Sequence, residues 1–275
     1  MKLQKMKAYM RSFLKWAGNK YRIIEQIRAC LPQAERLIEP FIGSATVFLN
    51  TRYSSYLLAD SNRDLIQLYQ YLQQEGQSFI NYCRLFFHPY FNNAEEFYRL
   101  RHLFNVSKEQ RIRAALMLYL NKHCFNGLAR FNRKGEFNTP FSRYKAPYFP
   151  EKEMQFFFQH AKDAKIIHAD FINTLALAKR GDVVYCDPPY VGLSKTANFN
   201  QYTADGFSHV QQISLASTAK NLAGQGITVI ISNHDTKFTR NIYQGAAILP
   251  LSVQRNISSK GSSREKVAEI LAIFQ

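Results

Sequence analysis

Cysteine is scarce in this chain, and the few cysteines that occur do not cluster. The 275 residues contain only Cys30, Cys83, Cys124 and Cys186, with no C-x-x-C pair and no histidine cluster beside them. This spacing argues against a disulfide framework and against a zinc site, so we expect reduced thiols in a cytosolic protein and no bound metal. Cys186 lies in a hydrophobic run and is expected to be a packed thiol.

Long apolar runs are also missing. No stretch approaches the roughly 18–20 apolar residues that a membrane-spanning helix needs. Residues 1–20 are basic but have neither a continuous apolar core nor a cleavage site, which argues against a signal peptide. These absences predict a soluble, cytoplasmic protein with no membrane partner.

Acidic residues are few relative to basic ones. Twenty Asp and Glu stand against 36 Lys and Arg, which leaves a net charge of +16. A globular chain this basic usually meets a polyanion such as nucleic acid, although a basic soluble protein without a nucleic-acid partner has the same composition. Binding at a membrane surface is disfavoured because the chain shows no long basic amphipathic helix.

Short apolar runs recur along the chain, each bounded by turn residues. Runs of this length, rich in Val and Ile, suit buried strands of a parallel or mixed sheet. The segment 203–226 between two of them has a helical pattern and ends at Gly224 and Gly226. Strands that alternate with helices predict a doubly wound α/β domain. The predicted strands lie in residues 36–41, 56–60, 164–170, 182–190, 227–233, 247–253 and 267–274.

Residues 61–146 break this alternation. They contain two helical patterns, at 93–104 and 108–123, followed by a stretch rich in Gly, Asn and Arg at 125–145. Between residues 84 and 145 there are 12 Lys and Arg against 4 Asp and Glu, so half of the net charge lies in under a quarter of the chain. We interpret 61–146 as an inserted domain that splits the α/β domain into residues 1–60 and 147–275.

In open α/β sheets, ligands bind at the carboxyl ends of the strands, and several of these strands end in informative residues. Gly43 follows the first strand and Asp60 ends the second, at the spacing of a ribose-binding acid. The loop EPFIGSATVF has a single glycine, so a dinucleotide looks disfavoured and a nucleoside without phosphates is easier to accept. Taken alone, Asp60 is better explained as an ordinary strand-end acid that caps the next helix.

Asp187-Pro188-Pro189-Tyr190 is a far more specific signal. The two prolines fix the backbone after a strand and remove two N–H groups, which leaves carbonyls free to accept hydrogen bonds. The Asp supplies a carboxylate acceptor beside them, and the Tyr supplies an aromatic face. Together these groups can hold a planar group that carries an NH₂, whereas a plain strand-terminating turn would not need all four.

Five motifs resemble those of the amino-methyltransferases, in particular the bacterial DNA adenine methyltransferase (Dam) group. They are FLKWAGNK (13–20), EPFIG (39–43), LAD (58–60), NGLAR (126–130) with GEFN (135–138), and DPPY (187–190). The similarity covers nearly the whole chain and follows the α-type order, in which the cofactor motifs precede the recognition segment and the catalytic motif. It implies a Rossmann-like methyltransferase fold with a mixed seven-stranded sheet, and makes 61–146 a mainly helical DNA-recognition domain with a hairpin.

The resemblance implies a site-specific DNA adenine-N6 methyltransferase with S-adenosyl-L-methionine as methyl donor. The Asp187 carboxylate and the Pro188 carbonyl would accept hydrogen bonds from the adenine amine, and Tyr190 would stack on the base. These acceptors favour a tetrahedral nitrogen whose lone pair can attack the methyl group. The implied cofactor contacts are Trp16 and Lys20 near the carboxylate end, Glu39 at the amino group, Asp60 at the ribose, Phe41 and Phe171 by packing, and Asp187. For Phe41 and Phe171, plain core packing explains the sequence equally well.

A base inside a duplex must be flipped out to reach such a pocket, which costs a few kcal/mol. Phe125 is either a wedge that fills the gap or a core aromatic of the insert, and the sequence favours neither. Arg130 is the leading residue for guanine, although a lone Arg in a basic loop more often contacts phosphate. Lys15, Pro140 and Tyr144 match positions that approach bases, while Asn126, Asn132 and Arg143 are assigned to phosphates. These matches imply GATC in double-stranded DNA. Separately, we expect a monomer that acts on the bacterial nucleoid without an obligate protein partner.

Two positions depart from the family pattern: Asn19 and Ala45 stand where Gly is usual, which could lower cofactor affinity. Two other functions also remain open. One is a different amino-methyltransferase, acting on cytosine N4, on RNA or on a protein amide, because the DPPY motif suits any planar NH₂. The other is a basic DNA-binding protein on an inactive methyltransferase fold, against which the intact Asp187 argues.

Overall fold

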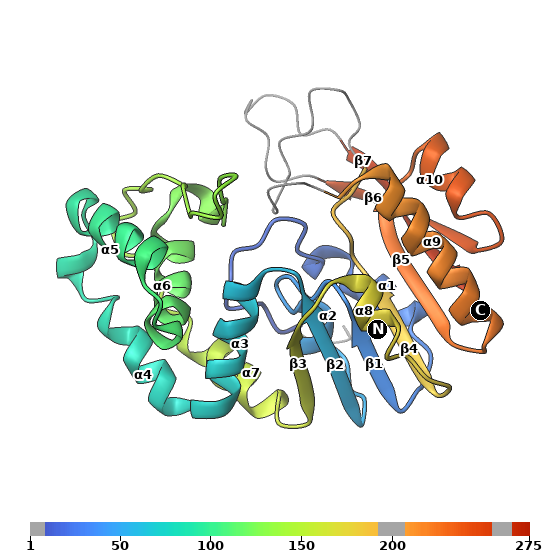
Figure 1. The fold of residues 1–275 in the computed structure, drawn as a ribbon, viewed down its shortest axis with the longest axis horizontal. Helices are drawn as coiled ribbons and strands as arrows, with labels where there is room; N and C mark the ends of the chain where they lie inside the picture. Colours follow the sequence, from blue (N-terminus) through green and yellow to red (C-terminus); the bar gives the residue numbers. More distant parts are fainter. Residues whose placement is uncertain (1–8, 192–206, 255–265) are drawn as a thin grey trace, which may run out of the picture.

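The computed structural model of the protein describes residues 9–191, 207–254 and 266–275 (Figure 1). The first residues of the helix predicted at 203–226 lie outside these ranges. Two lobes are visible. A sheet flanked by helices forms one, and a group of helices topped by a long loop forms the other. No helix within the described ranges is long and apolar enough to cross a membrane.

The described residues form a seven-stranded sheet in the order β3-β2-β1-β4-β5-β7-β6. Only β7 runs antiparallel to its neighbours, β5 and β6, while the other pairings are parallel. Each predicted apolar run contains one strand, so the mixed seven-stranded sheet is confirmed. The strands are β1 (Arg36–Glu39), β2 (Ser55–Asp60), β3 (Ala164–His168), β4 (Asp182–Cys186), β5 (Thr228–His234), β6 (Ala247–Gln254) and β7 (Lys266–Phe274).

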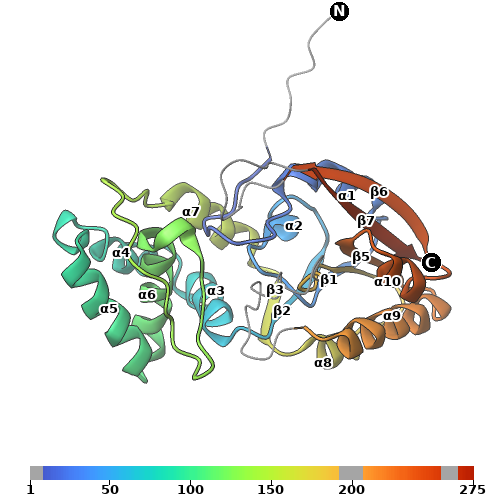
Figure 2. The same cartoon turned by 90° about the horizontal axis from the view of Figure 1, so that it is seen from above.

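Helices cover both faces of this sheet, which is why its central strands are mainly apolar and carry their polar residues at their ends (Figure 2). One face carries η1 (Tyr21–Ile23), α1 (Ile24–Cys30) and α2 (Thr46–Leu49), and the other carries α8 (Phe171–Leu175), α9 (His209–Gly224) and α10 (Lys237–Ile242). Ser208 and Gln211 form a capping box at the start of α9. The strand order reverses between β1 and β4, so a ligand site is expected at the carboxyl ends of these two strands.

The second lobe is built from the chain between β2 and β3. It contains α3 (Arg63–Glu75), α4 (Gln77–Leu85), η2 (Pro89–Phe91), α5 (Ala94–Val106), α6 (Gln110–His123), η3 (Phe125–Gly127) and α7 (Glu151–His160). Antiparallel bridges join Cys124 to Phe141 and Phe131 to Phe137, and they fold residues 124–141 into a hairpin-like loop. The division of the chain at 60/61 and 146/147 stays a prediction, because helices of this lobe also pack against the sheet.

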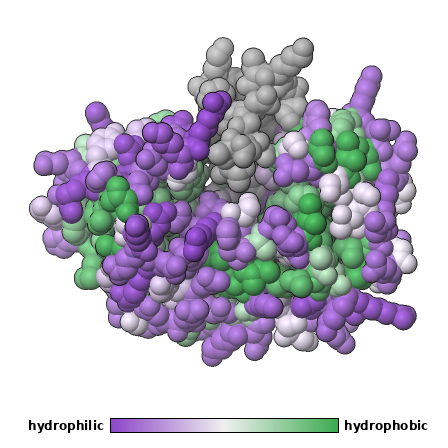
Figure 3. All heavy atoms as spheres, viewed as in Figure 1, coloured by the Kyte–Doolittle hydropathy of each residue, from purple (hydrophilic) through white to green (hydrophobic). Residues whose placement is uncertain are grey.

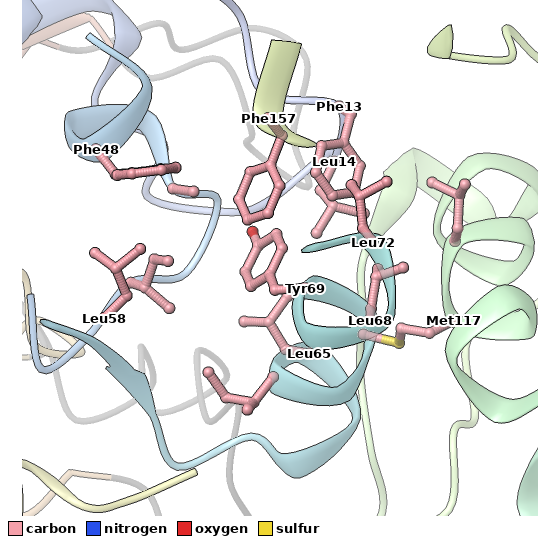
Figure 4. Close-up of a cluster of buried hydrophobic side chains, with 14 of the residues drawn as sticks. Phe13, Leu14, Phe48, Leu58, Leu65, Leu68, Tyr69, Leu72, Met117 and Phe157 are labelled. Carbon is pink, nitrogen blue, oxygen red and sulfur yellow. The ribbon is translucent and has the colours of Figure 1, made fainter. Parts of the chain in front are cut away.

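A continuous cluster of buried side chains connects the two lobes (Figure 4). The ring of Phe13, from the N-terminal segment, makes edge contacts with Tyr69 of α3 and Phe157 of α7, each at 5.6 Å between centroids. The cluster extends to Met117 of α6 on one side and to Leu58 of β2 on the other. Two ion pairs, Arg111 with Glu75 and Arg113 with Asp64, fasten α6 to α3 as well.

Candidate active site

Asp187 lies directly after β4, at the centre of the sheet and beside the end of β1. Its Oδ1 is 2.8 Å from the ammonium of Lys20, and the two side chains are 21% and 7% exposed. Burial raises the pKa of the Asp187 carboxyl, and the charge of Lys20 acts in the opposite direction. An ionised Asp187 therefore depends on its ammonium partner.

Lys20 connects the N-terminal motif with the loop that carries the DPPY motif, residues 187–191. Its ammonium donates a hydrogen bond to the carbonyl of Gly18 at 2.6 Å and lies 4.7 Å from the centroid of the Tyr190 ring. The resemblance implies a place for Lys20 near the carboxylate end of the cofactor. In this structure its ammonium contacts Asp187 and Tyr190.

The backbone after Asp187 is fixed by two buried amides that the sequence did not indicate. Gln212 of α9 donates from Nε2 to the carbonyl of Pro189 at 2.8 Å. Asn233, near the end of β5, accepts a hydrogen bond from the N–H of Val191 and donates to Oε1 of Gln212 and to the hydroxyl of Tyr243. Gln212 and Asn233 are fully buried, so the loop rests on a network in which each amide has partners.

The opposite side of this loop rests on the ends of β5 and β7. The hydroxyl of Tyr190 donates to Glu269 at 3.2 Å, and its ring packs edge-on against His234 at 4.8 Å. His234 donates from Nδ1 to the carbonyl of Val191 at 2.7 Å. Burial, followed by the charges of Asp187 and Glu269, raises the pKa of Tyr190, so its ring remains a neutral phenol. The only signal for this support in the sequence is the polar end, Ser-Asn-His, of an otherwise apolar strand.

Glu39, the last residue of β1, is a buried carboxyl only 2% exposed. Among the described residues, nothing forms a hydrogen bond with its Oε1 atom. Burial first, and then the charge of Asp187, raise the pKa of Glu39 well above its ordinary value. A buried acid of this kind fits a ligand that brings an amino or ammonium group, and the amino group of S-adenosyl-L-methionine has that chemistry.

Gly43 and Asp60 form the neighbouring edge of the site. The N–H of Gly43 donates to Oδ2 of Asp60 at 3.0 Å, and a side-chain carbon on Gly43 would lie 3.2 Å from the Trp16 indole. Gly43 thus gives Trp16 its close approach to the loop, at a φ of +45°. The helix after Asp60 is capped by Asn62, whose side chain accepts from the N–H of Leu65. The helix-cap explanation of Asp60 is therefore wrong.

Phe41 and Phe171 meet at the same carboxyl edge. Their rings stack at 5.7 Å, and both contact the ring of Phe207 edge-on, at 5.6 and 5.4 Å. Phe171 is 4% exposed, whereas Phe41 is only partly buried. The pair therefore packs as a core would and also presents a partly open aromatic surface beside the site.

The two departures from the family pattern have different local structures. Ala45 has a φ of +59°, a left-handed conformation that favours glycine, so the usual Gly at this position has a physical reason. Asn19 is absent from the residues with positive φ. Its side chain accepts a hydrogen bond from the N–H of Tyr21 at 2.7 Å and so closes the turn that precedes η1.

All but one of the residues predicted to contact DNA lie on the second lobe. The exception is Lys15, in the N-terminal segment. Phe125 is 52% exposed, so it is not a core aromatic of the insert. The ammonium of Lys15 lies 4.2 Å from the ring centroid of Tyr144, which joins the N-terminal segment to the loop. Pro140 is exposed, and its carbonyl accepts from the N–H of Phe125.

The remaining predicted contacts lie along the loop 126–143. Hydrophilic side chains cover much of the face seen in Figure 3, including the lobe that carries this loop. Arg130 is exposed, and its Nε donates to Oδ1 of Asn138 at 2.7 Å. Asn132 turns inward to close the tip of the loop, and its Nδ2 donates to Glu136 at 2.8 Å. Asn126 and Arg143 are both exposed and have φ values of +55° and +58°, so each stands at a sharp backbone turn.

Comparisons with known proteins agree with these features. The model of the D12 class N6 adenine-specific DNA methyltransferases matches residues 16–257. The DNA adenine methylase of Serratia marcescens is 48% identical over 266 residues, which cover 96% of this chain and 98% of that protein. The DNA adenine methylases of Salmonella typhi and Escherichia coli K12 are 48% and 47% identical over 265 residues, which cover 96% of this chain and 95% of each of those proteins.

Proposed function

Because the chain belongs to the D12 class of N6 adenine-specific DNA methyltransferases, we propose that it takes the methyl group from S-adenosyl-L-methionine and acts within GATC on a flipped-out adenine. Family membership itself makes the protein an adenine-specific DNA methyltransferase. It favours adenine N6 over the cytosine-N4, RNA and protein-amide substrates that the DPPY motif alone left open. The donor, the base flipping and the target sequence are the content of this proposal.

The residues around β1 and β2 supply the groups that such a donor needs. Glu39 would take its amino group, because its buried Oε1 calls for a cationic or N–H partner. Asp60 would take the ribose hydroxyls, and Trp16 would lie against the amino-acid end above Gly43. The stacked pair Phe41 and Phe171 would border the adenine or methionine portion.

The chemistry follows from Asp187 and Pro188. The bound donor supplies an electrophilic methyl group on a sulfonium. The adenine amine is a poor nucleophile because its lone pair is delocalised into the ring. A carboxylate and a carbonyl that both accept hydrogen bonds from this amine favour a tetrahedral nitrogen, which frees the lone pair. Gln212 already holds the Pro189 carbonyl, so the Pro188 carbonyl is the one left for the substrate. Tyr190 would stack on the base.

Access to this site requires the base to leave the duplex, since the Asp187 carboxylate is only 21% exposed. Phe125 is suited to fill the gap, because its side chain is large, apolar and 52% exposed. Arg130, Lys15, Pro140 and Tyr144 would address the bases. Asn126, Asn132 and Arg143 would contact phosphates, which set the register but carry no sequence information.

The observation that carries the proposal is the partly buried Asp187 carboxylate, paired with Lys20 and followed by two prolines, at the switch point of the sheet. The test is methylation of a pool of duplex DNA with S-adenosyl-L-methionine, followed by mapping of modified bases at single-base resolution. We expect N6-methyladenine within GATC. Modification at other sequences would overturn the specificity and leave the chemistry, whereas N4-methylcytosine would overturn adenine as the target base.

The inactive-fold alternative makes a different prediction in the same assay. A protein that binds the duplex pool but never transfers a methyl group would favour it over our proposal. We further propose that the enzyme acts as a monomer on chromosomal DNA. Sedimentation of the protein alone and with one duplex would test the monomer.

A further inference from the structure

Two asparagine side chains pin the N-terminal segment in the same way. Asn50 accepts from the N–H of Met10 at 2.7 Å and donates to the carbonyl of Met10 at 2.9 Å. Asn121 accepts from the N–H of Lys15 at 2.9 Å and donates to its carbonyl at 2.7 Å. Each side-chain amide thus bonds the backbone N–H and C=O of one residue, as a neighbouring strand would in a sheet.

The two asparagines differ in what else they hold. The third hydrogen bond of Asn50 goes to the carbonyl of Thr46, within the turn that carries Asn50 itself. The third hydrogen bond of Asn121 goes to the carbonyl of Gly127, in the loop predicted to read DNA. Asn121 is also fully buried in α6. Asn121 therefore connects three parts of the molecule: α6, the N-terminal segment and the loop at 124–141, called the recognition loop below.

The contact between Lys15 and Gly127 leaves no room for adjustment. A side-chain carbon on Gly127 would lie 2.4 Å from both Cβ and Cδ of Lys15, so the aliphatic part of Lys15 lies directly across this glycine. The ammonium of Lys15 ends over the ring of Tyr144, at 4.2 Å from its centroid. The backbone position that Asn121 imposes on Lys15 thus determines where its charge meets the loop.

The same segment continues into the catalytic site. Five residues after Lys15, Lys20 places its ammonium 2.8 Å from Asp187. Phe13 and Leu14, just before Lys15, are anchored in the shared core, so the segment is held firmly on that side too (Figure 4).

We propose that Asn121 is a positioning residue for sequence discrimination: it holds Lys15 in register with the loop Gly127–Arg130, so that both cations address the base edges of one target site. This inference rests on the proposed function, since it presumes that these residues face DNA. It assigns to a buried side chain, which touches no substrate, control over which duplex is methylated.

The test compares Asn121→Leu with the matched control Asn50→Leu, because Leu has a similar shape and each change removes three hydrogen bonds. For both variants and the wild type, kcat/KM is measured on the site found by the pool mapping and on duplexes that differ from it by one base pair. We expect Asn121→Leu to reduce the preference for the mapped site by about tenfold, within the range that one base-reading contact supplies. Asn50→Leu should lower the thermal midpoint and leave the preference unchanged.

A second variant covers the case in which Asn121→Leu does not fold. Gly127→Ala keeps all three hydrogen-bonding groups of Asn121 but displaces the stem of Lys15. An Ala at a φ of +66° is also strained, so the quantity compared is the ratio of kcat/KM on the mapped site and on its single-base variants, which should fall as in Asn121→Leu.

Three results would overturn the proposal: equal loss of kcat/KM on every duplex in Asn121→Leu, equal loss of preference in both asparagine variants, or unchanged preference in Gly127→Ala. A mapped site other than GATC would refute only the specificity proposed above, because the comparison uses whichever site the wild type prefers.

Discussion

The loop that carries the DPPY motif and the loop that carries Arg130 are held in different ways. The loop from Asp187 to Val191 has its backbone groups bound by buried side chains from other elements, among them Gln212, Asn233 and His234. The loop that carries Arg130 combines near neighbours, such as Arg130 with Asn138, with a few helix side chains: Asn121 holds the Gly127 carbonyl, and Asn105 of α5 binds both backbone groups of Phe137. Its polar side chains are largely exposed.

This difference separates two tasks. Hydrogen-bond acceptors act on a reacting amine only if they are already in place, because any rearrangement during the reaction would cost free energy. Contacts with bases are made from outside, by side chains that can leave a neighbour for a partner on DNA. We therefore expect changes to the buried support of the first loop to affect the rate, and changes on the second to affect which DNA is chosen.

The largest effect is expected from Asp187→Ala. Removing the acceptor for the amine should lower kcat by roughly 10²–10³-fold or more, in line with the loss of a single preorganised group elsewhere. Binding of duplex DNA, measured by fluorescence anisotropy, should change little. Asp235→Ala removes an acid of similar exposure, 18%, that is likewise paired with a cation, Arg240, and serves as the control. Unaltered methylation by the Asp187 variant would refute the mechanism.

A smaller loss of rate should follow when a hydrogen bond that holds the backbone of the DPPY loop is removed. Gln212→Met deletes the donor to the Pro189 carbonyl, and we expect kcat to fall roughly 10- to 100-fold while KM for DNA is kept, because small misplacements of reacting groups have effects of this size. Gln70 makes a similar bond, from Nε2 to the carbonyl of Ile166 at 2.9 Å, so Gln70→Met controls for lost stability. If both variants lose rate equally, the loop is not specially supported by Gln212.

On the loop predicted to read DNA, Arg130→Ala should change the preference among DNA sequences more than it changes kcat. Losing a bidentate contact with guanine would cost about 1–3 kcal/mol of discrimination at one base pair, measured as the ratio of kcat/KM on matched and mismatched duplexes. Arg143→Ala, at an exposed turn nearby, should weaken binding to all duplexes alike and flatten the salt dependence. A uniform effect of Arg130→Ala would reassign that residue to a phosphate.

The smallest effect concerns pH and the buried acid beside the catalytic loop. Burial raises the pKa of Glu39 in the folded protein, so the folded state binds this proton more tightly than the unfolded state does. The resulting contribution to the free energy of unfolding is present below the ordinary pKa and is lost as pH rises through the raised pKa. Without cofactor, Glu39→Gln should therefore match the wild type in stability near pH 4.5, the ordinary pKa of a Glu, and exceed it at pH 8. Urea unfolding at both pH values measures this, and a variant less stable at pH 8 would contradict the assignment.

The fold could be predicted, and the DPPY motif located, because their signals are local. Each strand is a short apolar run, and Asp187-Pro188-Pro189-Tyr190 concentrates its chemistry in four consecutive residues. The spacing from Gly43 to Asp60 was a weaker signal: taken alone it favoured a helix cap, whereas the carboxylate accepts from the N–H of Gly43.

The residues that hold these groups could not be predicted, because they lie far away in the sequence and are of ordinary types. Asn233 is 42 residues from Val191, and Asn121 is 106 residues from Lys15. For Asn121 the sequence does contain a signal. It follows Ala114, Met117 and Leu118 at helical spacing on the buried side of α6, and a buried polar side chain needs hydrogen-bond partners. The contact of Lys20 with Asp187 left no trace, since nothing local relates an N-terminal lysine to a strand end 167 residues away.

The core shared by the two lobes limits how this protein can exchange parts with its relatives. Tyr69 and Met117, inside 61–146, pack in one cluster with Phe13 and Leu58, outside it (Figure 4). A recombination that brought in a foreign segment 61–146 would set new side chains against an old core and separate Asn121 from the Lys15 it fits. New target preferences should therefore arise more readily by substitution on the exposed loop, or by joint inheritance of the N-terminal segment with the lobe, than by shuffling the lobe as a self-contained cassette.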